Sequence, residues 1–203
     1  MPKVYVRKKF LLYLDTNIFL DLIRNRNDDS VGLFQKIKKG AYRTVTSFFT
    51  LLEFMEDEQK RVFAEREIVI RKQSFDDVRT RIHERDLRKP ELEGIKVNLE
   101  KKIYKPFVDT EKIEIRYLDD VGWDRAYELQ SELNISSSDS IHLAIADILG
   151  CDVFVTNDSQ LRKVASEFFK SSKVIFASSS EIAEKIKALV EARKKQKQQR
   201  EKR

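Results

Sequence analysis

LLYLDTNIFLDLI, residues 11–23, places a carboxylate where an apolar run ends and an amphipathic segment begins. The run before Asp15 has the length and composition of a buried strand, and the residues after it repeat apolar positions at helical spacing. Asp is a good N-cap at such a junction, so capping and ligand binding both explain its position. The stretch therefore predicts a strand, a polar turn that carries an acid, and a helix.

Short apolar runs alternate with helical patterns along the rest of the chain. The predicted strands are residues 10–14, 42–46, 112–118, 152–156 and 173–177. The predicted helices are residues 17–25, 30–39, 48–73, 75–89, 122–133, 138–149, 159–169 and 179–193. Strands that alternate with helices indicate an α/β fold built on a mostly parallel sheet of about five strands.

The composition favours a single soluble domain. The chain has 203 residues, of which 41% are hydrophobic, and this is enough for one substantial core. One cysteine, Cys151, excludes an internal disulfide framework and is typical of a reducing compartment. The sequence has neither a signal-peptide pattern nor an apolar run of 18 residues, so we expect a cytoplasmic protein without a membrane segment.

The charges divide the chain into two parts. Residues 1–180 are expected to form one domain, in which 57–111 is a charged helical elaboration with breaks near Ser74 and Pro90. Residues 181–203 form a basic helix or tail, which from Lys187 onward holds eight basic and two acidic residues, the whole of the net charge of +6. This tail either binds phosphates without sequence preference or only improves solubility. The candidate nucleic-acid contacts in it are Arg193, Lys194, Lys195 and Lys197.

Four acids fall where a parallel α/β sheet binds its ligands, beyond the carboxyl ends of the strands. Asp15 follows the first strand, Glu53 lies early in the helix after the second, Asp139 begins a later helix, and Asp158 follows the fourth strand. Helix capping explains several of these acids one at a time. Their shared edge instead predicts one site to which all four contribute.

A divalent cation explains the set better than capping does. Glu53 lies in an apolar helix without a cation three or four residues away, and a buried carboxylate is costly unless something pairs with it. Clustered carboxylates repel one another, and a cation would keep them ionised. Oxygen ligands favour Mg²⁺ or Mn²⁺ over zinc. His142 is interpreted as a packed or supporting residue, and Asp21, Asp147 and Asp152 as solvated or capping acids.

The motifs LDTNIFLDL, SFFTLLE, DSIHLAIA and VFVTND, in this order, resemble the PIN-domain ribonucleases over roughly residues 10–177. The resemblance implies a three-layer α/β sandwich and cleavage of RNA, or sometimes DNA, that depends on Mg²⁺ or Mn²⁺. It assigns the metal-binding and catalytic roles to Asp15, Glu53, Asp139 and Asp158, and supporting roles to Thr16, Asn17, Thr156 and Asn157. Arg162 and Lys163, which follow Asp158 closely, are further candidate contacts for RNA, single-stranded or structured.

Toxin-type members of this family imply an antitoxin protein as a partner, and dimerisation, which is common in the family, implies a homodimer. Those members are usually shorter than this chain, with a smaller middle region than residues 57–111 and no long basic tail. Two other functions stay open: a non-catalytic scaffold that binds RNA or protein, and a metal-dependent DNA nuclease. A covalent aspartate enzyme is disfavoured because no acid lies two residues after Asp15, and a nucleotide-binding protein because the chain has no Gly-rich phosphate loop.

Overall fold

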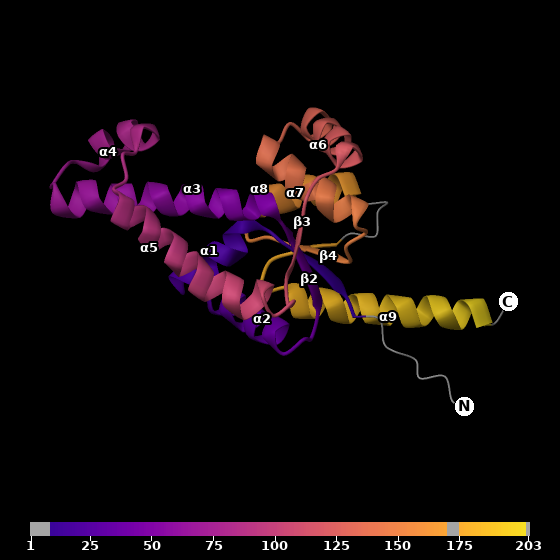
Figure 1. The fold of residues 1–203 in the computed structure, drawn as a ribbon. Helices are drawn as coiled ribbons and strands as arrows, with labels where there is room; N and C mark the ends of the chain where they lie inside the picture. Colours follow the sequence, from indigo (N-terminus) through magenta and orange to yellow (C-terminus); the bar gives the residue numbers. More distant parts are fainter. Residues whose placement is uncertain (1–8, 170–174, 202–203) are drawn as a thin grey trace.

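A computed structural model describes residues 9–169 and 175–201, and these fold as helices around one sheet (Figure 1). The strands are β1 (Leu11–Leu14), β2 (Arg43–Ser47), β3 (Glu114–Arg116), β4 (Val153–Val155) and β5 (Ile175–Ala177). The α-helices are α1 (Thr16–Arg24), α2 (Asp28–Lys38), α3 (Phe48–Glu65), α4 (Phe75–Arg81), α5 (Lys89–Leu99), α6 (Asp120–Leu133), α7 (Ser137–Ile148), α8 (Ser159–Phe168) and α9 (Ile182–Glu201). Three further helical segments are not α-helical: η1 (Arg66–Ile70) and η3 (Glu100–Val108) are π-helical, and η2 (Ile82–Glu84) is a 3₁₀ helix.

The sheet explains where the site lies. Its strands all run parallel in the order β3-β2-β1-β4-β5. The chain therefore adds β2 and β3 on one side of β1, and then β4 and β5 on the other side. The strand order therefore reverses between β1 and β4, where Leu14 pairs with Val155 and the Asp15 N–H donates to the Val155 carbonyl. Such a switch point opens a crevice at the carboxyl ends of the two strands. Asp15 and the residues after Val155 enter this crevice.

Side chains of β1 point alternately to the two faces of the sheet, and each face has its own core. Leu12 and Leu14 pack with apolar residues of α1, α2, α5, η3 and α9. Tyr13 packs on the opposite side with residues of α6, α7 and α8. The result is three layers, with the sheet buried between two layers of helices as the sequence predicted.

A helical arm, residues 56–99, projects from this sandwich (Figure 1). It consists of the distal part of α3, the turn η1, α4 at its far end, η2, and α5, which runs back beside α3. Its far end is held by ion pairs rather than by a large core. Arg66, 4% exposed, pairs with Glu67, Asp86 and Glu91. These contacts join α3 and η1 to the start of α5.

A second ion-pair cluster fixes α3 to α1 and predicts a measurable loss of stability. Glu58 is 1% exposed and accepts hydrogen bonds from Arg24 of α1 and from Arg61 of α3. We expect Glu58→Ala to lower the free energy of unfolding by about 2 kcal/mol, because it leaves two half-buried guanidinium groups without this partner. Urea denaturation measures the loss.

Glu65→Ala is the matched control for Glu58→Ala. Glu65 also pairs with Arg61, but its side chain is 63% exposed. Solvent screens such a pair, so its removal should change the free energy of unfolding by less than about 0.5 kcal/mol. Equal effects of the two substitutions would contradict a structural role for the Glu58 cluster.

The structure corrects several predicted boundaries. The helix predicted at 48–73 is α3 followed by the π-helical turn η1, and the helix predicted at 75–89 ends at Arg81 before the short turn η2. The breaks near Ser74 and Pro90 are confirmed, since Ser74 caps α4 and Pro90 lies in the first turn of α5. The last helix extends to Glu201 instead of 193.

Two further outcomes concern the sheet and the membrane. The sheet is entirely parallel, which is stricter than the mostly parallel sheet that the sequence predicted. Within residues 9–169 and 175–201, no helix combines the length and the apolarity that crossing a membrane requires.

The first turn of α9 packs on the sheet domain, where Ile182 is 2% exposed.

Candidate metal centre

Asp15 is held rigidly at the end of β1. It is 5% exposed and is the N-cap of α1, where its Oδ1 accepts the Thr16 N–H at 2.7 Å. Its Oδ2 accepts from Asn17 Nδ2 at 2.7 Å and from Thr156 Oγ1 at 2.6 Å. Capping and a site position are therefore compatible here, because the cap uses only part of the acceptor capacity of a carboxylate.

Glu53 reaches the same place from the second turn of α3. Ser47 caps this helix, and Leu51 and Phe54 turn into the core, so Glu53 faces the end of β1. Its Oε2 accepts a hydrogen bond from Thr16 Oγ1 and lies 2.7 Å from His142 Nε2. His142 is thus the cation partner that the local sequence around Glu53 does not supply.

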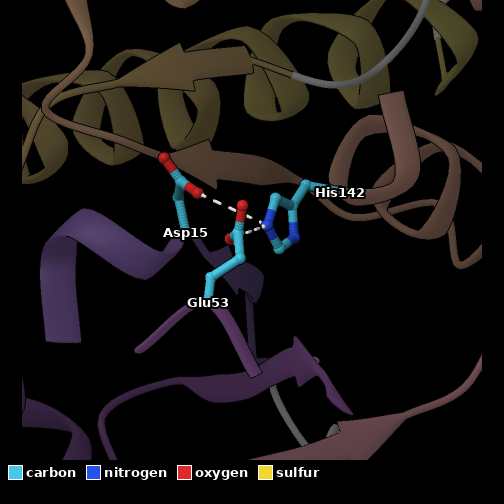
Figure 2. A group of neighbouring side chains, drawn as sticks. All are labelled: Asp15, Glu53 and His142. Carbon is cyan, nitrogen blue, oxygen red and sulfur yellow. Dashed lines mark hydrogen bonds and ion pairs between the residues drawn. The ribbon is translucent and has the colours of Figure 1, made fainter. Parts of the chain in front are cut away.

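His142 lies on α7 and is 1% exposed. Its Nε2 lies 2.7 Å from Glu53 Oε2 and 3.9 Å from Asp15 Oδ1. Figure 2 marks both contacts with dashed lines. Its Nδ1 lies 2.7 Å from the hydroxyl of Tyr13, which is fully buried in β1. The three side chains Asp15, Glu53 and His142 each offer one ligand atom, and these atoms lie within 4.8 Å of one another.

The electrostatics of this group indicate a shortage of positive charge. Burial raises the pKa of Asp15 above its ordinary value, although the charge of His142 opposes this rise. Burial would also raise the pKa of Glu53, but the hydrogen bond and charge of His142 outweigh it and lower that pKa. Burial disfavours the imidazolium of His142, yet Glu53 and Asp15 raise its pKa overall. The half-buried Glu53 and the buried His142 thus favour each other's charged forms, and His142 offsets the charge of Asp15 only in part.

All four predicted acids line one cleft at this edge of the sheet. Its volume is about 280 Å³. The residues that line it are Asp15, Thr16, Asn17, Leu20, Glu53, Glu56, Asp57, Lys60, Asp139 and Asp158. Asp139 and Asp158 are not part of the tight group around Asp15. The Asp139 carboxylate accepts from Ser136 Oγ at 2.7 Å, and that of Asp158 caps α8.

The acid Asp139 carries the same electrostatic signature as Asp15. Burial raises its pKa, and the nearby negative charges of Asp158 and Glu53 add to this effect. Asp139 lies in α7 and Asp158 is the N-cap of α8, yet the charge of Asp158 raises the pKa of Asp139 across the cleft. A cation that enters here would meet negative charge from both walls.

The predicted supporting residues hold the strand ends together. Thr156 is fully buried and donates to Asp15, and Asn17 Nδ2 donates to both Asp15 and Thr156. Asn157 lies one step further out: its N–H donates to Asn17 Oδ1, and its Nδ2 donates to Asp21 at 2.6 Å. These hydrogen bonds join α1 to the end of β4.

The interpretation of Asp21 as a solvated or capping acid is wrong. Asp21 is 5% exposed, pairs with Arg26, and accepts hydrogen bonds from Ser30 and Asn157. Asp147 pairs with Arg125, and Asp152 accepts the N–H of Leu11 at the start of β1. Each of these acids has a structural partner outside the cleft.

Of the proposed nucleic-acid contacts, Arg162 and Lys163 do not line the cleft. Arg162 pairs with Glu181, which follows β5, and Lys163 is exposed on α8. Arg193, Lys194, Lys195 and Lys197 lie on α9, but their side chains are outside the described residues. The assignment of these cations to RNA stays a prediction.

The sequence analysis did not predict three charged residues that line the cleft, nor the apolar Leu20. Glu56, Asp57 and Lys60 follow Glu53 by three, four and seven positions, so α3 presents all of them on one face. Helical periodicity counted from Glu53 would have found them. Their ionisable side chains make the α3 wall of the cleft charged along its length.

The fold and this site define the type of protein: an α/β domain with an acidic cleft at the switch point of a parallel sheet. A family model described as the PIN domain matches residues 12–167. The chain therefore belongs to the PIN-domain family, whose members are typically metal-dependent nucleases. No curated protein sequence matches the chain.

Three solved structures are similar to the chain at low sequence identity. A chain in the crystal structure of VapBC2 from Rickettsia felis, bound to a DNA fragment from their promoter, has 16% identity and a TM-score of 0.50, and the match covers 83% of this chain and 98% of that one. FitAcB from Neisseria gonorrhoeae has 15% identity, a TM-score of 0.49, and coverage of 81% and 96%. VapBC-1 from nontypeable Haemophilus influenzae has 14% identity, a TM-score of 0.46, and coverage of 84% and 99%.

The donor set fits a hard divalent cation. Two carboxylates converge at the tight group and two more face the same cleft, so oxygen is the dominant donor. Among the described residues, His142 supplies the nitrogen donor of the group, and both its ring nitrogens already have partners in Glu53 and Tyr13. This arrangement suits a histidine that orients a ligand better than one that is itself a ligand.

Proposed function

We propose that this chain is a metal-dependent endoribonuclease that hydrolyses phosphodiester bonds in its acidic cleft. The observation that carries the proposal is the meeting of Asp15 and Glu53 beside a cleft that Asp139 and Asp158 also line. Membership of the PIN-domain family supports it. The proposed cofactor is Mg²⁺ or Mn²⁺, held by these four carboxylates.

A bound divalent cation would lower the pKa of a water molecule and offset negative charge on the phosphodiester. The chain supplies the positions. Thr16, Asn17 and Thr156 fix the Asp15 carboxylate, and His142 with Thr16 fixes that of Glu53. Such fixed ligands need no reorganisation when substrate arrives, and this preorganisation is a major source of rate enhancement.

The products identify the reaction. With water as the nucleophile, the bond between phosphorus and the 3′ oxygen breaks, and cleavage leaves a 5′-phosphate and a 3′-hydroxyl. We expect a 5′-labelled single-stranded RNA to be cut in Mg²⁺ or Mn²⁺, to stay intact in EDTA, and to be cut again when the cation is restored. Products that end in 2′,3′-cyclic phosphate would contradict this reaction, because they require attack by the 2′-hydroxyl.

The same assay separates the competing functions. Single- and double-stranded DNA, tested in parallel, would identify a DNA nuclease if they are cut and RNA is not. A chain that binds RNA or protein in the presence of the cation but cuts no nucleic acid would be a non-catalytic scaffold. An antitoxin protein and a homodimer remain predicted partners, and size-exclusion chromatography with light scattering tests the latter.

A further inference from the structure

An acidic cleft creates a problem for a substrate that is itself a polyanion. RNA carries one negative charge per nucleotide and gains affinity chiefly from lysine and arginine contacts to its phosphates. Among the residues that the structure describes, Lys60 is the only lysine or arginine that lines the cleft. It is therefore the first place to look for a phosphate contact near the site.

Lys60 lies on the same face of α3 as Glu53, seven residues further along. At 1.5 Å per residue this spacing corresponds to about 10 Å along the helix axis. A phosphate at Lys60 would therefore belong to a nucleotide a few positions away from the bond at the proposed metal centre. The side chain is 36% exposed, so it is held against the wall and still open to solvent.

A second cation joins Lys60 from the helical arm. Glu56 Oε1 lies 2.9 Å from Lys60 Nζ and 3.6 Å from Arg85 Nη2. Arg85 follows the turn η2, and its Nε also donates to Gln59 Oε1 at 3.3 Å. The arm thus folds back and places a guanidinium beside α3, where two cations share one carboxylate and leave a net positive charge.

We propose that Lys60 and Arg85 form a phosphate-binding site for the backbone of single-stranded RNA, which would run from the acidic cleft along α3 toward the arm. The inference rests on the proposed function and extends it: the arm takes part in substrate binding. In the absence of RNA, Glu56 forms ion pairs with both Lys60 and Arg85, and a phosphate would replace it as their partner. Because backbone phosphates carry no sequence information, this site should bind RNA without base preference.

Fluorescence anisotropy with a labelled single-stranded RNA of about 12 nucleotides tests the site. Ca²⁺ replaces Mg²⁺ in this measurement, and a gel verifies that the RNA stays intact. We expect Lys60→Gln and Arg85→Gln each to weaken binding roughly three- to tenfold, and the slope of log affinity against log salt to fall by about 0.7 for each lost phosphate contact. Lys60→Arg should keep most of the affinity. In cleavage by the Mn²⁺-loaded enzyme, Lys60→Gln should raise KM and leave kcat nearly unchanged.

Lys105→Gln is the matched control, because Lys105 also pairs with a glutamate on its own helix but is absent from the cleft lining. It should change neither the RNA affinity nor the salt slope. Glu56→Gln should tighten RNA binding about two- to threefold, since it releases both cations. A merely structural role for the Lys60–Glu56 pair predicts the opposite sign or no change, and either result would overturn the proposal.

The outcomes also separate this inference from the proposed function. A wild-type chain that cuts RNA, with Lys60→Gln and Arg85→Gln variants that bind RNA normally, overturns the phosphate site and leaves the nuclease intact. A wild-type chain that neither binds nor cuts RNA overturns both. Loss of binding to poly-glutamate, with RNA binding unchanged in the same variants, would assign Lys60 and Arg85 to an acidic protein partner and overturn the RNA proposal.

Discussion

Replacing Asp15 with Asn should lower metal-dependent RNA cleavage by roughly a thousandfold or more, about 4 kcal/mol in the activation free energy, and should leave the fold intact. Asn keeps the side-chain oxygen that accepts the Thr16 N–H, so the cap of α1 survives. The substitution removes the negative charge nearest to the Glu53–His142 pair. Cleavage of labelled RNA in Mn²⁺ measures the loss, and circular dichroism verifies the fold.

A binding readout makes this prediction independent of the assay substrate. A cation that binds only the folded chain raises its melting temperature, by an amount that grows with the ratio of its concentration to its Kd. Mn²⁺ should therefore stabilise the wild-type chain and the Asp109→Asn control, in which the substituted acid is exposed at the end of η3. It should stabilise Asp15→Asn far less. Wild-type cleavage and an unchanged Mn²⁺ response in Asp15→Asn would exclude Asp15 as a ligand.

The pH dependence of the metal-free chain gives a third readout for Asp15. Burial raises the pKa of Asp15 in the folded state above its ordinary value. The stability that this carboxyl contributes is then present below its ordinary pKa and is lost as pH rises through the raised one. Asn does not ionise, so Asp15→Asn should lose less stability than the wild type as pH rises from about 4 through the raised pKa of Asp15.

The sequence could place Asp15, Glu53, Asp139 and Asp158 at one edge because that inference needs only strand order and the direction of parallel strands. Each acid follows a strand or opens a helix, and these positions are readable from the alternation of apolar and polar residues. The architecture was equally readable, since short apolar strands between amphipathic helices permit few other folds. What the pattern determines is thus topology, together with the residues that topology brings to an edge.

The sequence pattern could not predict which distant side chains pair with one another. Nothing local to Glu53 or His142 says that they meet, because they lie 89 positions apart and touch only after α3 and α7 pack on the same sheet edge. Asp21 was misread for the same reason, since its partner Asn157 follows a distant strand. The turn from η2 to α5 that places Arg85 on α3 also depends on the fold of the arm. Long-range polar contacts of this kind follow from the packing of elements, which periodicity does not encode.

His142→Ala should destabilise the metal-free chain by about 3–5 kcal/mol, the second large effect that the structure predicts. The substitution removes a fully buried imidazole ring, leaves the carboxylates of Glu53 and Asp15 without this partner, and opens a cavity beside Tyr13. Removal of one partner from a buried ion pair is costly because the other charge stays in a poorly solvated place. Urea denaturation in EDTA measures this loss. His83→Ala is the control, because His83 is exposed and should change stability by less than about 0.5 kcal/mol.

Two refinements of this experiment separate charge from volume. His142→Gln retains a hydrogen-bond donor and part of the volume but carries no charge, so its loss should be intermediate if the ion pair and the packing both contribute. Addition of Mn²⁺ should then narrow the gap between the wild type and both variants, because a cation near Asp15 and Glu53 supplies the positive charge that the imidazolium provided. A gap that stays the same in saturating Mn²⁺ would mean that the cation and His142 act on different carboxylates. If His142→Ala lowers the free energy of unfolding by less than about 1 kcal/mol, Glu53 and Asp15 do not depend on His142 for their charge balance. The inference that this edge of the sheet lacks positive charge would then be wrong.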